Sequence, residues 1–244
     1  MSFLKVENLV VRLGDPERTV LDNLSFSVSE PSVVLVLGAN GSGKSVLLRT
    51  ILGLHRIAQG TISVDGAAPR QQQHRRQYKQ QRRKIHQRSG VAFQNPDYQI
   101  FGDTVADDLR IGRSDGSIPG HPAVEAMGLT PLLNSPPQQL SGGQRRRLAL
   151  AGAFAAADDF LFLDEPFIEL DYPHILHLVD LITAARDRGT TVLVASHETR
   201  DIWDIADQVL LLYQGKGLAF GSIEEVRHHV SPAVGLRPLE GTSL

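Results

Sequence analysis

The sequence predicts an α/β fold built around a parallel β-sheet. The main evidence is three continuous apolar runs, at residues 33–37, 160–163 and 190–195, because strands that are buried on both faces of a parallel sheet have this composition. A helical pattern at 174–188 separates the second run from the third. The first run ends in a glycine-rich turn that leads into a helical pattern at 45–54. Strand and helix therefore alternate as they do in parallel sheets.

Shorter elements complete the expected order. Alternating apolar and polar residues predict strands at 3–11 and 25–28. The remaining strands are expected at 60–66, 90–93, 209–213 and 217–220, the last two as a closing hairpin. Residues 95–139 are rich in Pro, Gly and Asp and contain amphipathic pieces at 104–111 and 123–133. This composition favours a small helical subdomain.

We expect one domain over residues 1–221, with the helical subdomain at 95–155 inside it, followed by a short tail at 222–244. A chain of 244 residues, 41% of them hydrophobic, can bury a sizeable core. No apolar run approaches the roughly 18 residues of a membrane-spanning helix, and the N-terminus lacks a secretory pattern, so we expect a cytosolic protein. The absence of cysteine excludes thiolate catalysis and cysteine-based metal sites.

One segment carries much of the positive charge. Residues 70–88 contain eight Lys and Arg and no acidic residue, which leaves 17 basic residues against 27 acidic ones elsewhere. The simplest interpretation is a solvated helix or loop, because runs of charge are usually solvated faces. Contact with anionic lipid head groups or with RNA is the alternative.

A phosphate-binding loop follows the first buried run. The segment GANGSGKS matches GxxxxGK[ST], in which backbone N–H groups wrap phosphates, the lysine reaches the β- and γ-phosphates and the hydroxyl ligates Mg²⁺. Lys44 and Ser45 take the last two places and open a helix, whose dipole also favours anions. A structural glycine turn is the alternative, and the position between strand and helix argues against it. The expected ATP-binding residues are Gly38, Ala39, Asn40, Gly41, Ser42, Gly43, Lys44, Ser45 and Val46.

Two adjacent carboxylates, Asp164 and Glu165, follow the buried run at 160–163. Open α/β sheets gather their ligands at the carboxyl ends of their strands. We expect Asp164 to hold Mg²⁺, directly or through water, and Glu165 to orient or deprotonate the attacking water. Alone, such a pair is more often a helix cap or a turn. The phosphate-binding loop in the same chain favours the catalytic interpretation.

A second anion-binding edge is expected at the start of a long helix. Residues 140–144 read LSGGQ and precede a strongly helix-forming segment, so Ser141 and the following glycines stand at a helix N-terminus with free N–H groups. One chain with one phosphate-binding loop cannot obviously use both edges on one ATP, so we infer that this edge faces the nucleotide of another copy. A capped helix start is the alternative. We expect the three arginines at 145–147 to meet phosphate or solvent, because they oppose the helix dipole.

In this order the motifs resemble those of the ATPase subunit of an ATP-binding cassette (ABC) transporter, over nearly the whole chain from residue 4 to about 221. The resemblance implies a P-loop ATPase core with a parallel sheet, an antiparallel N-terminal β-subdomain and a helical signature subdomain. It also implies that Gln94 reaches Mg²⁺ and the attacking water, and that His197 hydrogen-bonds the γ-phosphate.

The same resemblance completes the expected site. The Mg²⁺ ligands would be Ser45, Gln94 and Asp164, and the catalytic residues Glu165, His197 and Gln94. The ATP of the opposite subunit would be contacted by Ser141, Gly142, Gly143, Gln144 and the D-loop residue Asp171. Two positions depart from the family pattern. Leu13 replaces the aromatic residue that stacks on adenine and offers no π face, and Glu169 stands where a glycine is common in the D-loop, so we expect an altered backbone course.

The region after Gln94 is similar to the energy-coupling factor (ECF) subgroup, which imports vitamins and cobalt or nickel ions. The similarity rests on FQNPDYQIF at 93–101, TVADD at 104–108 and AVGLRP at 233–238. It implies that residues from Gln94 to Asp108 dock onto a membrane-embedded T component. The carboxylates available to pair with its arginines would be Asp103, Asp107 and Asp108, with an ordinary solvated acidic turn as the alternative.

We therefore predict the ATP-binding and ATP-hydrolysing subunit of an ECF-type importer, which uses ATP and Mg²⁺ on the cytoplasmic face of the membrane. It would work with a second ABC ATPase, identical or similar, and with a T component and a membrane substrate-binding subunit. The cargo, a vitamin or a metal ion, stays open, and nucleic acid is not an expected partner. The alternatives are an ABC ATPase acting on nucleic acid or ribosomes and a regulatory module with little hydrolysis.

Overall fold

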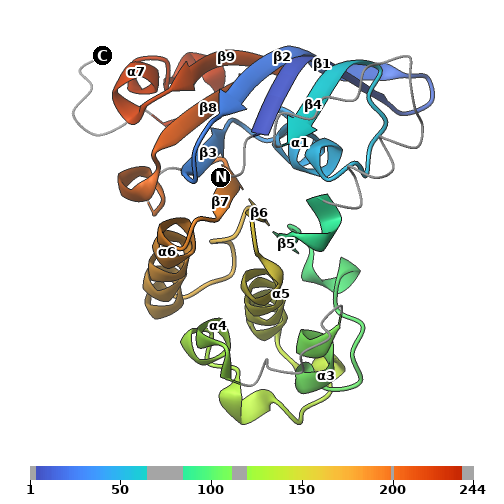
Figure 1. Cartoon of the computed structure of the whole chain (residues 1–244), viewed down its shortest axis with the longest axis vertical. Coiled ribbons are helices and arrows are strands. Elements are labelled where there is room, and N and C mark those ends of the chain that lie inside the picture. Colours follow the sequence, from blue (N-terminus) through green and yellow to red (C-terminus); the bar gives the residue numbers. More distant parts are fainter. Residues whose placement is uncertain (1–3, 65–84, 112–119, 199–200, 238–244) are drawn as a thin grey trace.

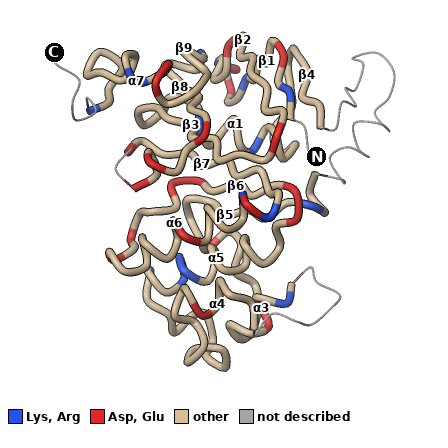
Figure 2. Tube along the Cα trace, turned by 60° about the vertical axis from the view of Figure 1, so that its left-hand side comes forward, with Lys and Arg blue, Asp and Glu red and all other residues tan. Residues whose placement is uncertain are grey.

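The computed structural model describes residues 4–64, 85–111, 120–198 and 201–237. Within these ranges, two β-sheets lie at one end of the molecule and a helical subdomain lies at the other (Figure 1). Most of the basic segment at 70–88 lies outside the described residues, so its predicted role stays a prediction. In the view of Figure 2 the described basic residues are interspersed with acidic ones.

A three-stranded antiparallel sheet, in the order β2–β1–β4, forms the N-terminal subdomain. Its strands are β1 (Leu4–Leu13), β2 (Arg18–Val28) and β4 (Gln59–Val64). The predicted antiparallel subdomain is confirmed, because β1 pairs antiparallel with both neighbours. The strand β2 begins at Arg18 and not at residue 25, since pairing with β1 extends it.

The second sheet has six strands in the order β5–β6–β7–β3–β8–β9. Neighbouring strands from β5 to β8 in this order run parallel, and β9 runs antiparallel to β8. The predicted parallel core and closing hairpin are therefore confirmed. The strands are β3 (Val33–Leu37), β5 (Ser89–Ala92), β6 (Phe160–Asp164), β7 (Thr191–Ser196), β8 (Gln208–Tyr213) and β9 (Lys216–Gly221).

Three of the described helices carry the site or its surroundings: α1 (Lys44–Ile51), α5 (Gly142–Ala156) and α6 (Tyr172–Asp187). The short helices α3 (Val105–Arg110) and α4 (Pro122–Ala126) pack against α5 at the far end of the molecule (Figure 1). The amphipathic piece predicted at 123–133 is divided in two. Gly128, with a positive φ of 62°, ends α4, and a separate 3-10 turn follows it.

The large sheet separates two hydrophobic cores. Because successive side chains of a strand point to opposite faces, Val33 and Leu35 belong to the core shared with α5 and α6, whereas Val34 and Val36 belong to the core shared with α1 and the N-terminal sheet. Every residue of β3 is fully buried. Burial on both faces is the reason that β3 is continuously apolar.

The expected tail packs on the first of these cores. The helix α7 (Ile223–Arg227) begins with a capping box formed by Ser222 and Glu225. The buried apolar side chains from this region are Val226, Val230, Val234 and Leu236. Residues 222–237 therefore contribute to the core of the domain, and 238–244 lie outside the described residues.

Candidate nucleotide-binding site

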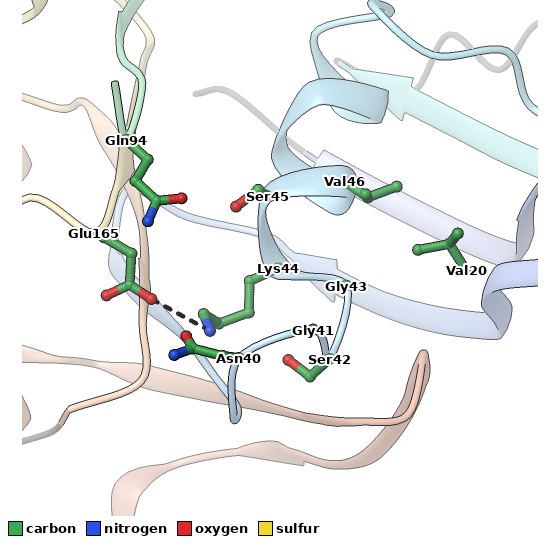
Figure 3. A pocket seen from close by; sticks show the side chains of 10 residues that line it. All are labelled: Val20, Asn40, Gly41, Ser42, Gly43, Lys44, Ser45, Val46, Gln94 and Glu165. Carbon is green, nitrogen blue, oxygen red and sulfur yellow. Dashed lines mark ion pairs between the residues drawn. The ribbon is translucent and has the colours of Figure 1, made fainter. Parts of the chain in front are cut away.

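The loop between β3 and α1 forms one wall of a pocket of about 390 Å³. Gly43 turns the chain into α1 with a φ of 107°, which L side chains rarely adopt, and a Cβ there would lie 2.7 Å from Leu21 Cδ2. Figure 3 shows Gln94 and Glu165 facing this loop from the other side of the pocket. The lining residues are Val20, Asn40, Gly41, Ser42, Gly43, Lys44, Ser45, Val46, Gln94 and Glu165.

The Lys44 side chain is buried at the loop. Its Nζ donates to the carbonyl oxygens of Gly38 at 2.7 Å and Ala39 at 3.3 Å, and it lies 3.3 Å from Glu165 Oε1. The side chains of Lys44 and Glu165 are each 6% exposed. Buried charges need such partners, because removing them from water is costly. Gly38 and Ala39 thus hold the lysine through their carbonyls.

Asp164 ends β6 beside Ser45 of α1. Ser45 Oγ donates to Asp164 Oδ1 at 2.9 Å, whereas the buried Oδ2 has no hydrogen-bond partner among the described residues. Burial raises the pKa of the Asp164 carboxyl, and the bond from Ser45 opposes this rise. Hard cations such as Mg²⁺ prefer oxygen ligands. The unpartnered carboxylate oxygen and the adjacent hydroxyl therefore fit the expected metal site.

Glu165 occupies the turn after β6 with a positive φ of 50°. Its N–H donates to the Ala195 carbonyl at 2.8 Å, which ties the turn to β7. Its Oε2 lies 2.9 Å from His197 Nδ1. A carboxylate only accepts hydrogen bonds, so this contact is a hydrogen bond in the His197 tautomer that carries a hydrogen on Nδ1. The Glu165 carboxylate therefore lies between the Lys44 ammonium and the His197 imidazole.

The sheet order explains this convergence. Gln94 follows β5, the two carboxylates lie at the end of β6 and His197 follows β7, and these strands are neighbours with the same direction. Their carboxyl ends therefore meet at one edge, beside the end of β3 that carries the phosphate-binding loop. Residues as distant in the sequence as Ser45 and Asp164, which are 119 positions apart, are brought together in this way.

Five residues expected at the ATP and Mg²⁺ site of the same chain are not among those that line the pocket. Four of them, Gly38, Ala39, Asp164 and His197, contact the lining residues Lys44, Ser45 or Glu165. The fifth is Leu13, which is half-buried and packs against the apolar core. Val20 on β2 lines the pocket and was missed by the sequence analysis. Nothing in the sequence separates Val20 from the other apolar residues of that strand, since only the placement of β2 beside the loop selects it.

The second expected anion edge lies at the start of α5, outside this pocket. Ser141 Oγ accepts from the Gln144 N–H at 3.2 Å, and Gln144 Oε1 accepts from the Ser141 N–H at 2.8 Å. This reciprocal pair is a capping box. Ser141 and Gly142 are exposed. The N-terminal edge of α5 is therefore open to a second molecule and is not buried in the core of its own chain.

The D-loop is linked to α5 through a histidine. Asp171 caps α6 by accepting from the His174 N–H at 3.2 Å, and its carboxylate also bonds the His174 ring, which lowers the pKa of Asp171. His174 Nε2 accepts from Arg147 Nη1 at 2.8 Å. Glu169 has a φ of 64°, the left-handed conformation that glycine favours. The turn therefore keeps a glycine-like conformation at this position despite the substitution.

Among the arginines at 145–147, Arg146 corrects one expectation, since it does not face solvent, whereas Arg145 and Arg147 are partly exposed. Arg146 is 2% exposed. Its Nη1 donates to the carbonyls of Phe93 at 2.6 Å and Gln94 at 2.9 Å, and its Nη2 donates to those of Asp164, at 2.9 Å, and Glu165. The helical spacing from 146 to the buried positions 150 and 153 was the available sign that this arginine faces the core.

The segment after Gln94 also differs in part from expectation. Asp108 Oδ1 accepts from the N–H groups of Phe101 at 2.7 Å and Gly102 at 2.9 Å, so this carboxylate shapes its own loop. Asp107 bonds Thr104 and Arg110. The most exposed apolar side chains of the segment are Tyr98, at 68%, and Phe101, at 73%. Asp103 and Asp107 are exposed as well, so the segment presents both apolar and acidic surface.

These residues define the class of protein: a P-loop nucleotide-binding cassette with a signature helix. The ABC transporter family matches residues 21–168, more than half of the chain. The chain therefore belongs to the ABC transporter ATPase family, and it is an ABC ATPase.

Several known proteins are similar to it. A protein of Halobacterium salinarum that is described as an ABC transporter ATP-binding protein is 34% identical to this chain. The match covers 97% of this chain and all of the relative. The energy-coupling factor transporter ATP-binding protein EcfA of Methanocaldococcus jannaschii is 31% identical over 93% of this chain and 81% of its own. Some relatives are longer, and the chain spans 28% of one from Bifidobacterium longum.

A solved structure is similar over almost its full length. CbiO1 from Clostridium perfringens, part of the ABC transporter complex CbiONQ, has a TM-score of 0.74 and 26% sequence identity. The match covers 95% of this chain and 96% of that one. Within the described ranges, no helix is both long and apolar enough to cross a membrane.

Proposed function

We propose that this ABC ATPase energises an ECF-type importer from the cytoplasmic face of the membrane. The observation that carries the proposal is the convergence of Lys44, Ser45, Asp164 and Glu165 on one pocket. The similarity to EcfA and CbiO1 favours the ECF type over other ABC transporters. The described residues offer no observation that favours the nucleic-acid alternative.

The proposed roles follow from the contacts. Lys44 and the loop N–H groups would bind the triphosphate of ATP, and Ser45, Asp164 and Gln94 would hold Mg²⁺, which would neutralise developing charge on the phosphates. Glu165 would orient and deprotonate the attacking water. Lys44 and His197 hold its carboxylate from two sides. The lysine would leave this pair to bind phosphate, which frees one carboxylate oxygen for water.

Hydrolysis is proposed to need two cassettes. The start of α5 at Ser141 and Gly142 is exposed and lies apart from the pocket of its own chain. Its free N–H groups and positive dipole end would bind the phosphates held by a partner cassette. Asp171 and the D-loop would lie at the same interface. Two sites would then form together, each with residues from both copies.

The segment from Gln94 to Asp108 is proposed as the contact with a membrane T component. Tyr98 and Phe101 expose apolar rings, and amphipathic aromatic anchors are common at the centre of protein interfaces. Arg145 Nε lies 3.0 Å from Asp97 Oδ1, so this surface is tied to α5. The substrate-binding subunit would select the cargo, a vitamin or a metal ion.

Affinity purification from membranes of the native host tests this proposal. The tagged chain should copurify with integral membrane subunits, and their identification by mass spectrometry would assign the importer. The variant Phe101→Ala/Tyr98→Ala should lose these subunits and keep ATP binding, whereas Leu218→Ala, an exposed apolar control on β9, should keep both. Retention of membrane subunits by the double variant would refute the assigned surface.

A further inference from the structure

Arg146 is a buried cation beside the turn at Glu165. The proposed function gives this arginine no role. It is 2% exposed, although it lies only five residues after the exposed Ser141 that begins the signature edge. Burial lowers the pKa of Arg146, and the nearby charges of Asp164, Glu165 and Glu169 oppose this. A buried guanidinium is costly unless its donors are satisfied. The groups that accept its hydrogen bonds therefore show which parts of the structure this arginine supports.

The guanidinium joins the ends of two paired neighbouring strands, β5 and β6. Its Nη1 donates to the carbonyls of Phe93 and Gln94 at the end of β5, and its Nη2 donates to those of Asp164 and Glu165 at the end of β6. A planar fork can place two donor atoms at fixed separation, which an ammonium cannot. The geometry is thus specific to arginine.

The segment after β6 needs such support. Glu165 has a φ of 50°, a conformation that is sterically unfavourable for residues with a Cβ and is retained only where the surroundings enforce it. The carbonyls on both sides of this turn accept from one nitrogen of Arg146, while the Glu165 N–H donates to Ala195. Arg146 therefore helps to fix the direction in which the Glu165 carboxylate points.

We propose that Arg146 is a positioning residue that aligns the Glu165 carboxylate and the Gln94 loop with the signature helix, without itself touching nucleotide. Arg146 belongs to α5, whose N-terminal edge would bind the partner's nucleotide. If α5 shifts on binding, Arg146 moves with it and shifts the carbonyl groups to which it donates. Glu165 and Gln94 then reach their working positions only when the two cassettes are joined. This inference rests on the proposed function of Glu165.

The test compares Arg146→Lys and Arg146→Gln with Arg227→Lys, an arginine on α7 that pairs with Glu224. ATP affinity, kcat and KM for phosphate release and thermal unfolding are measured on the full chain. Lysine keeps the charge and glutamine keeps two donors, but neither provides the fork. We expect both Arg146 variants to bind ATP within about threefold of the parent and to lose about 100-fold in kcat, since misplacement of a catalytic group by about 1 Å has this effect. Arg227→Lys should match the parent.

A double variant separates this inference from the proposed function. Arg146→Lys added to Glu165→Gln should lower kcat by less than about threefold, because both changes act through one carboxylate. A parent-like kcat for Arg146→Lys with an inactive Glu165→Gln overturns the inference and leaves the proposed function intact. A parent-like Glu165→Gln instead refutes the proposed role of Glu165. Loss of ATP binding and of cooperative unfolding in both Arg146 variants would show a purely structural role and also overturns the inference.

Discussion

At the scale of single residues, the proposed chemistry of the pocket depends on the carboxylate of Glu165. It lies between Lys44 and His197 and is almost fully buried. The conservative change Glu165→Gln keeps the shape of the side chain and removes its ability to accept a proton. We expect the variant to bind ATP, to accumulate as a nucleotide-bound dimer and to lose about 10²- to 10⁴-fold in turnover, the usual contribution of a general base.

Phosphate-release kinetics and size-exclusion chromatography with ATP measure these two effects. Lys44→Ala is the matched control, since it should lose ATP affinity and therefore not accumulate as a nucleotide-bound dimer. Phosphate release by Glu165→Gln near the parent rate would contradict the general-base role.

Glu169 gives a second residue-scale prediction. Its φ of 64° is favourable for glycine and unfavourable for residues with a Cβ. Glu169→Gly should therefore be more stable than Glu169→Ala by about 1 kcal/mol. The comparison with alanine cancels the loss of the carboxylate, which lies near Gly142. Urea denaturation measures the difference, and equal midpoints for the two variants would show that the backbone relaxes.

At the scale of secondary-structure elements, the contact of α5 with β5 supports the whole site. A Cβ at Gly90 would lie 1.8 Å from the Ala153 carbonyl oxygen, whereas a Cβ at Gly152, on the same helix, would meet nothing within 4 Å. Gly90→Ala should push α5 away from the sheet and destabilise the fold by about 1–3 kcal/mol. The substitution should also weaken the hydrogen bonds from Arg146 to the carbonyls of Gln94 and Glu165, and so reduce turnover.

The matched control is Gly152→Ala, which should stabilise the protein by about 0.5–1 kcal/mol because glycine is unfavourable inside a helix. Denaturant unfolding and ATPase rates of the two variants measure the contrast. A Gly90→Ala variant as stable as the parent would mean that α5 can shift at little cost.

At the scale of the whole molecule, two copies must contribute to each ATP site if the signature edge of one faces the loop of the other. Lys44→Ala and Ser141→Arg should each be inactive alone, because every site in either homodimer carries one defect. A mixed dimer has one site with both defects and one intact site. A 1:1 mixture should therefore recover about a quarter of the parent activity, given random pairing in a twofold-symmetric dimer.

Steady-state ATPase assays of the mixture at increasing protein concentration test this complementation. A mixture of Lys44→Ala with Glu165→Gln is the control and should stay inactive, because both residues belong to the half-site of the phosphate-binding loop, so every site in a mixed dimer carries one defect. Failure of the first mixture to recover activity would contradict a site shared between copies.

The sequence by itself determined the strands and the phosphate-binding loop, and it predicted the roles that are proposed for most site residues. Continuous apolar runs such as 33–37 and motifs with fixed spacing are local signals, since burial on both faces and phosphate binding each restrict residue type within a few positions. This is why Lys44, Asp164, Glu165 and His197 could be selected without coordinates.

Only the tertiary structure decided which side chains face the pocket and which support it. Val20 lines the pocket and Leu13 does not, Asp108 shapes its own loop, and Arg146 is buried against four carbonyls. The lining of the pocket depends on where β2 lies beside the loop, and the burial of Arg146 depends on backbone carbonyls 18 to 53 positions away in the sequence. A backbone carbonyl is the same in every residue, so the sequence carries no mark of where such partners will lie.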